Sequence, residues 1–80
     1  MRLDKYLKIS RIIKWRTVAN EACDAGRVEV NGKVARASYE VKVGDLLSIT
    51  FGERTFRAEV VSVTEHARKE EAALMYKLVD

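Results

Sequence analysis

Apolar residues near the start of the chain recur at helical spacing. Leu3, Tyr6 and Leu7 stand three and four positions apart, so residues 2–9 are predicted to form a short amphipathic helix. Residues 10–14 contain β-branched isoleucines, which lower helix propensity, and we expect a bend or an irregular turn there. The pattern therefore predicts a first helix that stops before the next one begins.

A second helix is predicted over residues 17–25. Its apolar face consists of Val18, Ala19, Ala22 and Cys23. Thr17 is a candidate N-cap, but Asn20 stands three positions later where a full capping box would have Glu or Gln. Gly26 is expected to end the helix as its left-handed C-terminal residue.

The period then changes from helical spacing to alternation, which predicts a β-hairpin. Apolar Val28, Val30 and Val34 alternate with the charged residues Glu29 and Lys33. Between the two runs stands Asn31-Gly32, the dipeptide that best fits a type I′ turn, because both central positions need a positive φ.

Further strands are predicted in the second half of the chain. Residues 37–43 are interpreted as a connection with a short edge segment, and 46–51 as a strand. Gly52-Glu53 has glycine first, as a type II′ turn requires, and residues 54–63 are predicted to run back as a longer strand.

A C-terminal helix is predicted over residues 69–77. Ala72, Met75, Tyr76 and Val79 keep helical spacing, so this helix is expected to pack on the sheet. The whole pattern predicts an α+β fold, with two N-terminal helices, a β-hairpin, a small antiparallel sheet and this last helix.

Composition is that of one small domain over residues 1–80. The chain is 48% hydrophobic and 34% charged, which is typical of a globular domain. It contains one cysteine and neither an apolar signal segment nor a run long enough to cross a membrane, so we expect a cytoplasmic protein without membrane contact. We also expect a monomer.

The charge is unevenly distributed along the chain. The net charge is only +3, but residues 1–36 carry nine Lys or Arg against four Asp or Glu, whereas the remainder carries six against eight. Such an asymmetry points to an N-terminal half that binds a polyanion.

Most of the N-terminal positive charge falls in one series. Its members are Arg2, Lys5, Lys8, Arg11, Lys14 and Arg16. At these spacings the residues fan around an ideal helix, so they form one patch only if the chain bends near Ser10. A solvated charged face is the alternative, but such a face normally mixes signs, and Asp4 is the only acid before Glu21.

Two residues within this series allow two interpretations each. Trp15 could stack on an unpaired base between its basic neighbours, or it could pack where the helices meet. Asp4 could pair with Lys8 and favour the helix start, or it could accept hydrogen bonds from a ribose hydroxyl or a base amine.

Candidate catalytic and metal-binding residues are sparse. His66 is the only histidine and is interpreted as a solvated surface residue, and Cys23 as a small core residue. The four glycines are explained as turns and form no phosphate-binding loop. We therefore expect no enzymatic activity, no metal and no cofactor.

At the level of motifs, the chain resembles the S-four (S4) RNA-binding domain, also called the alpha-L motif. The matching motifs are Arg2-Leu3-Asp4 with Leu7, Arg16-Thr17-x-Ala19, Gly26-x-Val28-x-Val30-Asn31-Gly32 and Val43-Gly44-Asp45. They span residues 1–51, and the resemblance implies RNA bound on the helix pair. At the matching positions, Arg2, Asp4, Arg11 and Arg16 would face RNA, whereas Trp15 departs from the family pattern, in which a basic residue commonly stands there.

The expected RNA-binding residues combine the charge pattern with this resemblance. They are Arg2, Asp4, Lys5, Lys8, Arg11, Lys14, Trp15, Arg16, Thr17, Arg27, Lys33 and Arg36.

Some members of this family are free-standing domains. With residues 69–76 at its end, the chain most resembles the RqcP proteins of bacterial ribosome-associated quality control, which are short relatives of the heat-shock S-four protein. That resemblance implies binding to obstructed large ribosomal subunits with peptidyl-tRNA, contacts to large-subunit rRNA and tRNA, and assistance to an RqcH-type tailing factor that adds alanine. The competing hypothesis is a regulatory module whose basic face binds an acidic protein.

Overall fold

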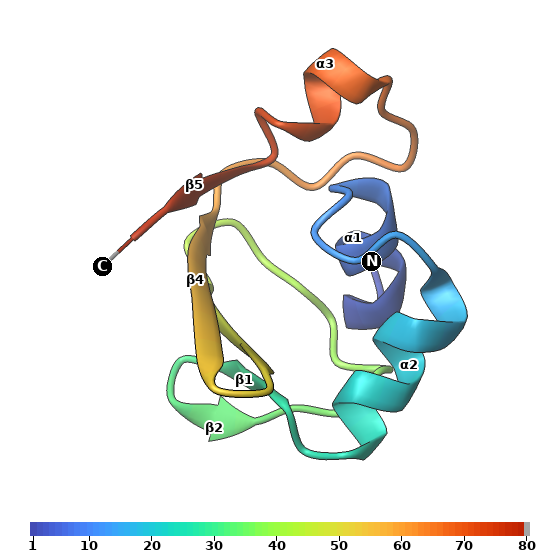
Figure 1. Cartoon of the computed structure of the whole chain (residues 1–80). Helices are drawn as coiled ribbons and strands as arrows, with labels where there is room; N and C mark the ends of the chain where they lie inside the picture. The colour runs from blue at the N-terminus through green and yellow to red at the C-terminus, as the bar shows by residue number, and fades with distance from the viewer. Residues whose placement is uncertain (80) are drawn as a thin grey trace.

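One antiparallel sheet and a pair of helices on its inner side make up most of the computed structural model, which describes residues 1–79 (Figure 1). In chain order the elements are α1 (Leu3–Ile9), α2 (Arg16–Asp24), β1 (Val28–Val30), β2 (Lys33–Val34), β3 (Leu46–Phe51), β4 (Arg54–Val60), α3 (Lys69–Ala72) and β5 (Tyr76–Leu78). The strands are ordered β2-β1-β3-β4-β5 in the sheet. The predicted α+β class is confirmed.

The bend predicted between the first two helices is present. Helix α1 ends at Ile9, and Arg11 then takes a left-handed conformation with a φ of 63°. Buried Ile13 returns to the core and its amide donates to the carbonyl of Leu7 over 3.0 Å. Helix α2 begins one residue earlier than predicted, with Trp15 at the N-cap position, so the prediction that Thr17 caps it is wrong.

Gly26 ends α2 and passes the chain into the predicted hairpin. It has a φ of 75°, and the amides of Gly26 and Arg27 donate back to Cys23 and Ala22, which is the Schellman arrangement. In the hairpin, Val30 pairs with Lys33 in β2 around the Asn31-Gly32 turn.

The turn has the geometry predicted from its sequence. Asn31 and Gly32 both have positive φ, 52° and 84°. The Asn31 side chain also joins the hairpin to the start of β3, because it donates to Asp45 over 3.1 Å and accepts from the amide of Leu46 over 3.0 Å. These two bonds fix the turn of the hairpin to the start of β3.

The next two strands form the centre of the sheet. Strand β3 has the predicted bounds, and it pairs along its length with β4 across the Gly52-Glu53 turn. Strand β4 ends at Val60 and not at residue 63, because the following amides of Val61 and Ser62 both donate to the carbonyl of Met75 and leave the strand direction. The segment 37–43 forms no named strand and instead makes an isolated bridge between Glu40 and Arg2.

The prediction of a C-terminal helix over residues 69–77 is wrong. Helix α3 has only four residues, and β5 follows it along the edge of β4. In Figure 1, α3 lies at the top of the molecule above α1 and does not cover the sheet. A strand is favoured here because it pairs the otherwise open edge of β4 and places Met75, which is fully buried, at the crossover into the sheet.

The core joins the helices to the inner face of the sheet. Its largest fully buried side chains are Tyr6, Leu3, Leu7, Leu47, Ile49, Met75, Val28 and Val60. The Tyr6 hydroxyl donates to the Met75 carbonyl over 2.8 Å and satisfies a buried polar group. Cys23 is buried, as predicted, and burial raises its pKa to about 11.

Candidate nucleic-acid interface

Asp4 lies at the junction of the two helices and organises the side chains around it. It is only 2% exposed, and its carboxylate accepts from the Lys5 amide over 2.8 Å and from the Asn20 side chain over 3.2 Å. Arg2 Nε donates to the same carboxylate over 3.2 Å, and the Arg16 guanidinium lies 3.5 Å from it. One buried acid thus orients two arginines from two different elements.

The pKa of Asp4 reflects these contacts. Burial by itself would raise the pKa, but hydrogen bonds from Asn20, Arg2 and the Lys5 amide, together with the charge of Arg16, outweigh burial and hold the pKa below its ordinary value. Asp4 is therefore ionised at neutral pH. Its oxygen atoms are occupied within the protein, and Lys8, with which one of the two interpretations paired it, is not among its contacts.

Arg2 and Arg16 keep much of their guanidinium surface free for a ligand. Their side chains are 51% and 49% exposed although both contact Asp4. An arginine held on one side by a carboxylate presents its remaining N–H groups in a fixed direction, which suits recognition of phosphate oxygens. The structure brings these two residues of the expected site together.

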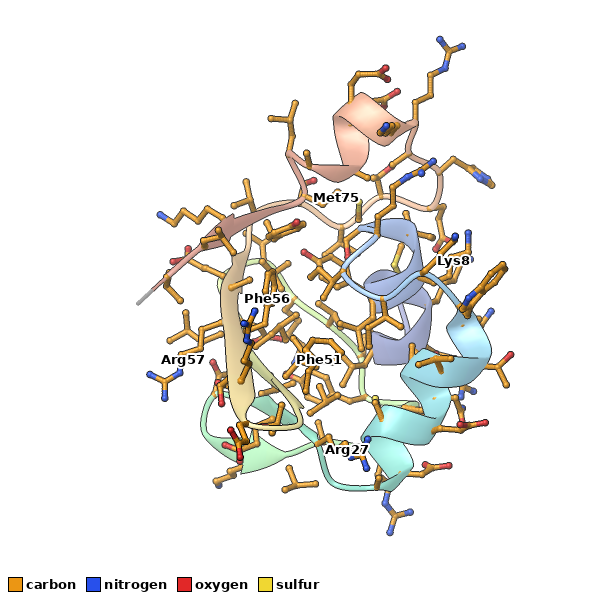
Figure 2. All side chains as sticks on the ribbon, viewed as in Figure 1. Lys8, Arg27, Phe51, Phe56, Arg57 and Met75 are labelled. Atoms are coloured by element: carbon orange, nitrogen blue, oxygen red, sulfur yellow. The ribbon has the colours of Figure 1, made fainter. Side chains whose placement is uncertain are left out.

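The bend after α1 gathers the other basic residues of the series. Exposed Lys8, Arg11 and Lys14 surround a hollow of about 410 Å³, and Trp15 forms its remaining wall. Figure 2 shows Lys8 on the side of the molecule opposite to Arg57 of β4. The bend near Ser10, without which the basic series could not form one patch, is therefore present.

Trp15 is 61% exposed, so the interpretation that it packs between the helices is wrong. The Lys14 ammonium lies 5.3 Å from the centre of the indole ring, within the range of a cation–π contact. An exposed aromatic ring beside a cluster of cations can stack on an unpaired base while its neighbours hold phosphates.

The remaining expected residues are placed less closely together. Lys33 and Arg36 line a hollow of about 690 Å³ behind the hairpin, and Arg27 lies beside Phe51 at the far end of α2 (Figure 2). Thr17 is exposed on the first turn of α2. Lys5 is ion-paired with Glu65, so its charge is partly used inside the protein.

Sequence reasoning missed Asn20 as a part of this interface. It is half-buried on α2 and holds Asp4 from the opposite helix. Its one signal in the sequence was its place one turn after Arg16, because residues four apart lie on the same side of a helix.

The remaining features of residues 1–79 are the histidine, the potential metal ligands and the length of the helices. His66 is exposed, as predicted. No group of three or more potential metal-ligating side chains occurs in this part of the chain. Among the same residues, none of the helices combines the length and the apolar character that crossing a bilayer needs.

Comparisons with known proteins identify the family. The family model described as "S4 domain" matches residues 1–47. The "RQC P-site tRNA stabilizing factor" of Halalkalibacterium halodurans is 53% identical over 78 residues, which cover 98% of this chain and 89% of that protein. The factor of the same description from Streptococcus pneumoniae is 49% identical, with 99% of this chain and 90% of that protein covered.

A solved structure supports the fold independently. The heat shock protein 15 of Vibrio cholerae, described as trimeric, superposes with a TM-score of 0.91 at 28% identity, over 99% of this chain and 81% of the other. With a family match over more than half its length and close relatives along almost all of it, the chain belongs to the S4 domain family and, within it, to the group of RQC P-site tRNA stabilizing factors.

Proposed function

We propose that this protein is a non-enzymatic, RNA-binding factor of bacterial ribosome-associated quality control that stabilises tRNA in the P site of obstructed large ribosomal subunits. The observation that carries the proposal is the arrangement around Asp4, where one buried carboxylate aims half-exposed Arg2 and Arg16 outward. The relatives described as P-site tRNA stabilizing factors support the same role.

The proposed RNA surface runs from this arginine pair across the bend. Lys8, Arg11 and Lys14 add positive charge there, and exposed Trp15 supplies a face for an unpaired base. Thr17, Lys5, Lys33 of the hairpin, and Arg27 and Arg36, which flank the hairpin, extend the surface on either side. Asp4 acts from within by positioning arginines, since its oxygens already accept hydrogen bonds.

The proposal includes the partners that the family resemblance implies. The surface contacts both large-subunit rRNA and the tRNA, in the cytoplasm, and retention of the peptidyl-tRNA assists an RqcH-type factor in adding alanine tails. Phosphate contacts supply most of the affinity, so binding weakens strongly as salt rises.

Sedimentation of a cell extract through a density gradient tests the ribosomal role. The protein should travel with large subunits at low salt and return to the top of the gradient at high salt. Nuclease treatment is the control, because an acidic protein partner would keep the complex intact after RNA digestion. A protein that stays entirely at the top at low salt contradicts the proposal.

Arg16→Ala tests the arginine pair directly. Binding of tRNA by the variant should weaken, and the slope of log affinity against log salt should fall by about one unit if the guanidinium contacts a phosphate. Arg57→Ala is the matched control, since it removes the same charge from the opposite side of the molecule (Figure 2). Equal affinities of the Arg16 and Arg57 variants would remove Arg16 from the site.

A further inference from the structure

A second hollow of about 400 Å³ lies between the end of α1 and the segment that precedes α3. Lys8 and Arg11 line it on one side, and Glu65, His66, Arg68 and Glu71 line it on the other. The two walls are more than fifty residues apart in the chain. The N-terminal charge pattern therefore gave no indication of the second wall.

The second wall is held in place by specific contacts with α1. Glu65 forms an ion pair with Lys5, and the Tyr6 hydroxyl donates to the Met75 carbonyl beyond α3 over 2.8 Å. Val63 and Ala67 pack against the core on either side of His66. The segment is therefore a fixed part of the surface and can present its side chains in a defined direction.

The charges around this hollow favour an anion. Lys8, Arg11 and Arg68 are cationic and exposed. Of the two carboxylates, Glu65 is paired with Lys5, which leaves Glu71 as the acid that opposes them. His66 adds N–H and N groups that can bond to a phosphate or a ribose in either protonation state.

This hollow shares Lys8 and Arg11 with the one beside Trp15. The two hollows are therefore neighbours, separated by the same pair of cations. A chain that passes over Lys8 and Arg11 can place a base against Trp15 on one side and its next backbone group against Arg68 on the other.

From this continuity we infer that the segment around His66–Arg68 is a second wall of the RNA site, and that Arg68 and His66 bind the sugar-phosphate backbone of an unpaired RNA segment whose base stacks on Trp15. This inference rests on the proposed RNA-binding function and extends its surface to the C-terminal part of the chain. The surface thus binds RNA from two sides of the bend.

Arg68→Ala tests the second wall, with a fluorescent stem-loop RNA that carries a single-stranded overhang as the probe. The slope of log affinity against log salt should fall by about one unit, because one phosphate contact is lost. Arg57→Ala should leave both affinity and slope unchanged. Arg68 is exposed and makes no side-chain hydrogen bond or ion pair within residues 1–79, so the variant should fold normally, which circular dichroism checks.

A comparison of overhang and blunt duplex probes distinguishes binding of an unpaired RNA segment from non-specific electrostatic attraction between the basic surface and RNA. The loss in Arg68→Ala should be larger with the overhang than with a blunt duplex of the same length. An equal loss with both probes would overturn the assignment of an unpaired RNA segment.

Glu71→Gln provides a test with the opposite sign. Removing this carboxylate from the hollow should strengthen binding of the overhang probe, because like charge next to a phosphate opposes binding. Glu70→Gln is the matched control on the same short helix, since Glu70 is exposed but does not line the hollow. Equal affinities of these two variants would count against the second wall.

The outcomes distinguish this inference from the proposed function. If Arg16→Ala weakens RNA binding and Arg68→Ala equals Arg57→Ala, the second wall is wrong and the RNA-binding function stands. If the unmodified protein binds neither tRNA nor the overhang probe at low salt, the proposed function itself fails.

Discussion

Asp4 is the residue at which we expect the stability of the fold and the proposed RNA binding to depend on the same contacts. Its buried carboxylate is compensated by Asn20, Arg2, Arg16 and the Lys5 amide. Replacing one carboxylate oxygen by an amide NH2 leaves part of these donors without an acceptor and removes the charge that Arg2 and Arg16 face. Loss of a buried hydrogen-bonded acceptor typically costs about 1–3 kcal/mol. The residue therefore serves the fold as well as the orientation of the arginines.

Asp4→Asn should lower the free energy of unfolding by about 1–3 kcal/mol and weaken tRNA binding by the folded protein. Urea unfolding and RNA titration measure the two effects. Asp24→Asn, an exposed acid on the last turn of α2, is the control and should change stability little. If both variants behave alike, Asp4 does not organise the interface.

The pH dependence of stability should show the same carboxylate together with Asp45. Burial would raise the pKa of Asp45, but hydrogen bonds from the Lys42 amide, Tyr39 and Asn31 hold it below its ordinary value, as for Asp4. A carboxyl whose folded pKa is depressed stabilises the fold above its unfolded pKa and loses that contribution as pH falls.

The free energy of unfolding should therefore fall as pH drops below the ordinary Asp pKa of about 3.8. Urea midpoints measured from neutral to acidic pH follow this effect. Asp4→Asn should be less stable at neutral pH but should lose less stability on acidification. An equally steep acid limb in the variant would show that Asp4 is not the titrating group.

At this scale the sequence was informative about charge but not about burial. Charge counting found Arg2 and Arg16, yet the position of Asp4 inside the junction depends on Asn20, which reaches it from another helix. Trp15 shows a second limit of sequence analysis. Its neighbours in the sequence do not indicate whether its ring is packed or exposed, and in the structure the residue is 61% exposed.

Among the elements, the hairpin is the one whose sequence specifies its shape most directly. Gly32 has a φ of 84°, which alanine adopts only at a cost, and a Cβ there would meet no other atom within 4 Å. The effect of a substitution is therefore backbone strain and not a steric clash.

Gly32→Ala should destabilise the protein by about 1–2 kcal/mol, the cost of a left-handed conformation for an L-residue. The folded variant should keep most of its tRNA affinity, because the substitution removes no cation and because Arg2 and Arg16 lie at the starts of α1 and α2. Glu53→Ala, at the turn position whose φ is negative, is the control and should alter stability much less. A loss of affinity without loss of stability would place the turn in the RNA interface.

The C-terminal elements show where local pattern fails. The spacing of Ala72, Met75 and Tyr76 suits a helix, and a helical turn does form at α3. Beyond it, pairing of β5 with β4 and the acceptance of three hydrogen bonds by the Met75 carbonyl decide the conformation. These partners lie far away in the chain, so a local period could not reveal them, whereas the hairpin and β3 needed only neighbouring residues.

The whole molecule separates a basic helical side from a sheet whose outward charges are mixed. Glu59 and Lys77 pair across β4 and β5 on that sheet over 3.8 Å. The bend, the arginine pair and the second wall all lie on the helical side. Orientation on a polyanion is therefore set by the fold and not by the small net charge of +3.

The edges of the sheet bear on the expectation of a monomer. Strand β2 has two residues and carries Lys33, and β5 has three residues and carries Lys77 at its centre. Short edge strands with lysine resist pairing with another chain. Leu78 is exposed next to Lys77, so we expect the charge of this lysine to oppose edge-to-edge association at β5 in addition to the short length of the strand.

Sedimentation equilibrium should therefore give a mass of 9.1 kDa at all concentrations tested. The trimeric description of the Vibrio cholerae relative supplies the specific alternative, a threefold mass that would contradict a monomer. Lys77→Val removes the charge from the centre of β5 and should promote association, whereas Lys42→Val, on an exposed loop, should not. If the Lys77 variant also remains monomeric, strand length alone protects this edge, and the charge has no part in it.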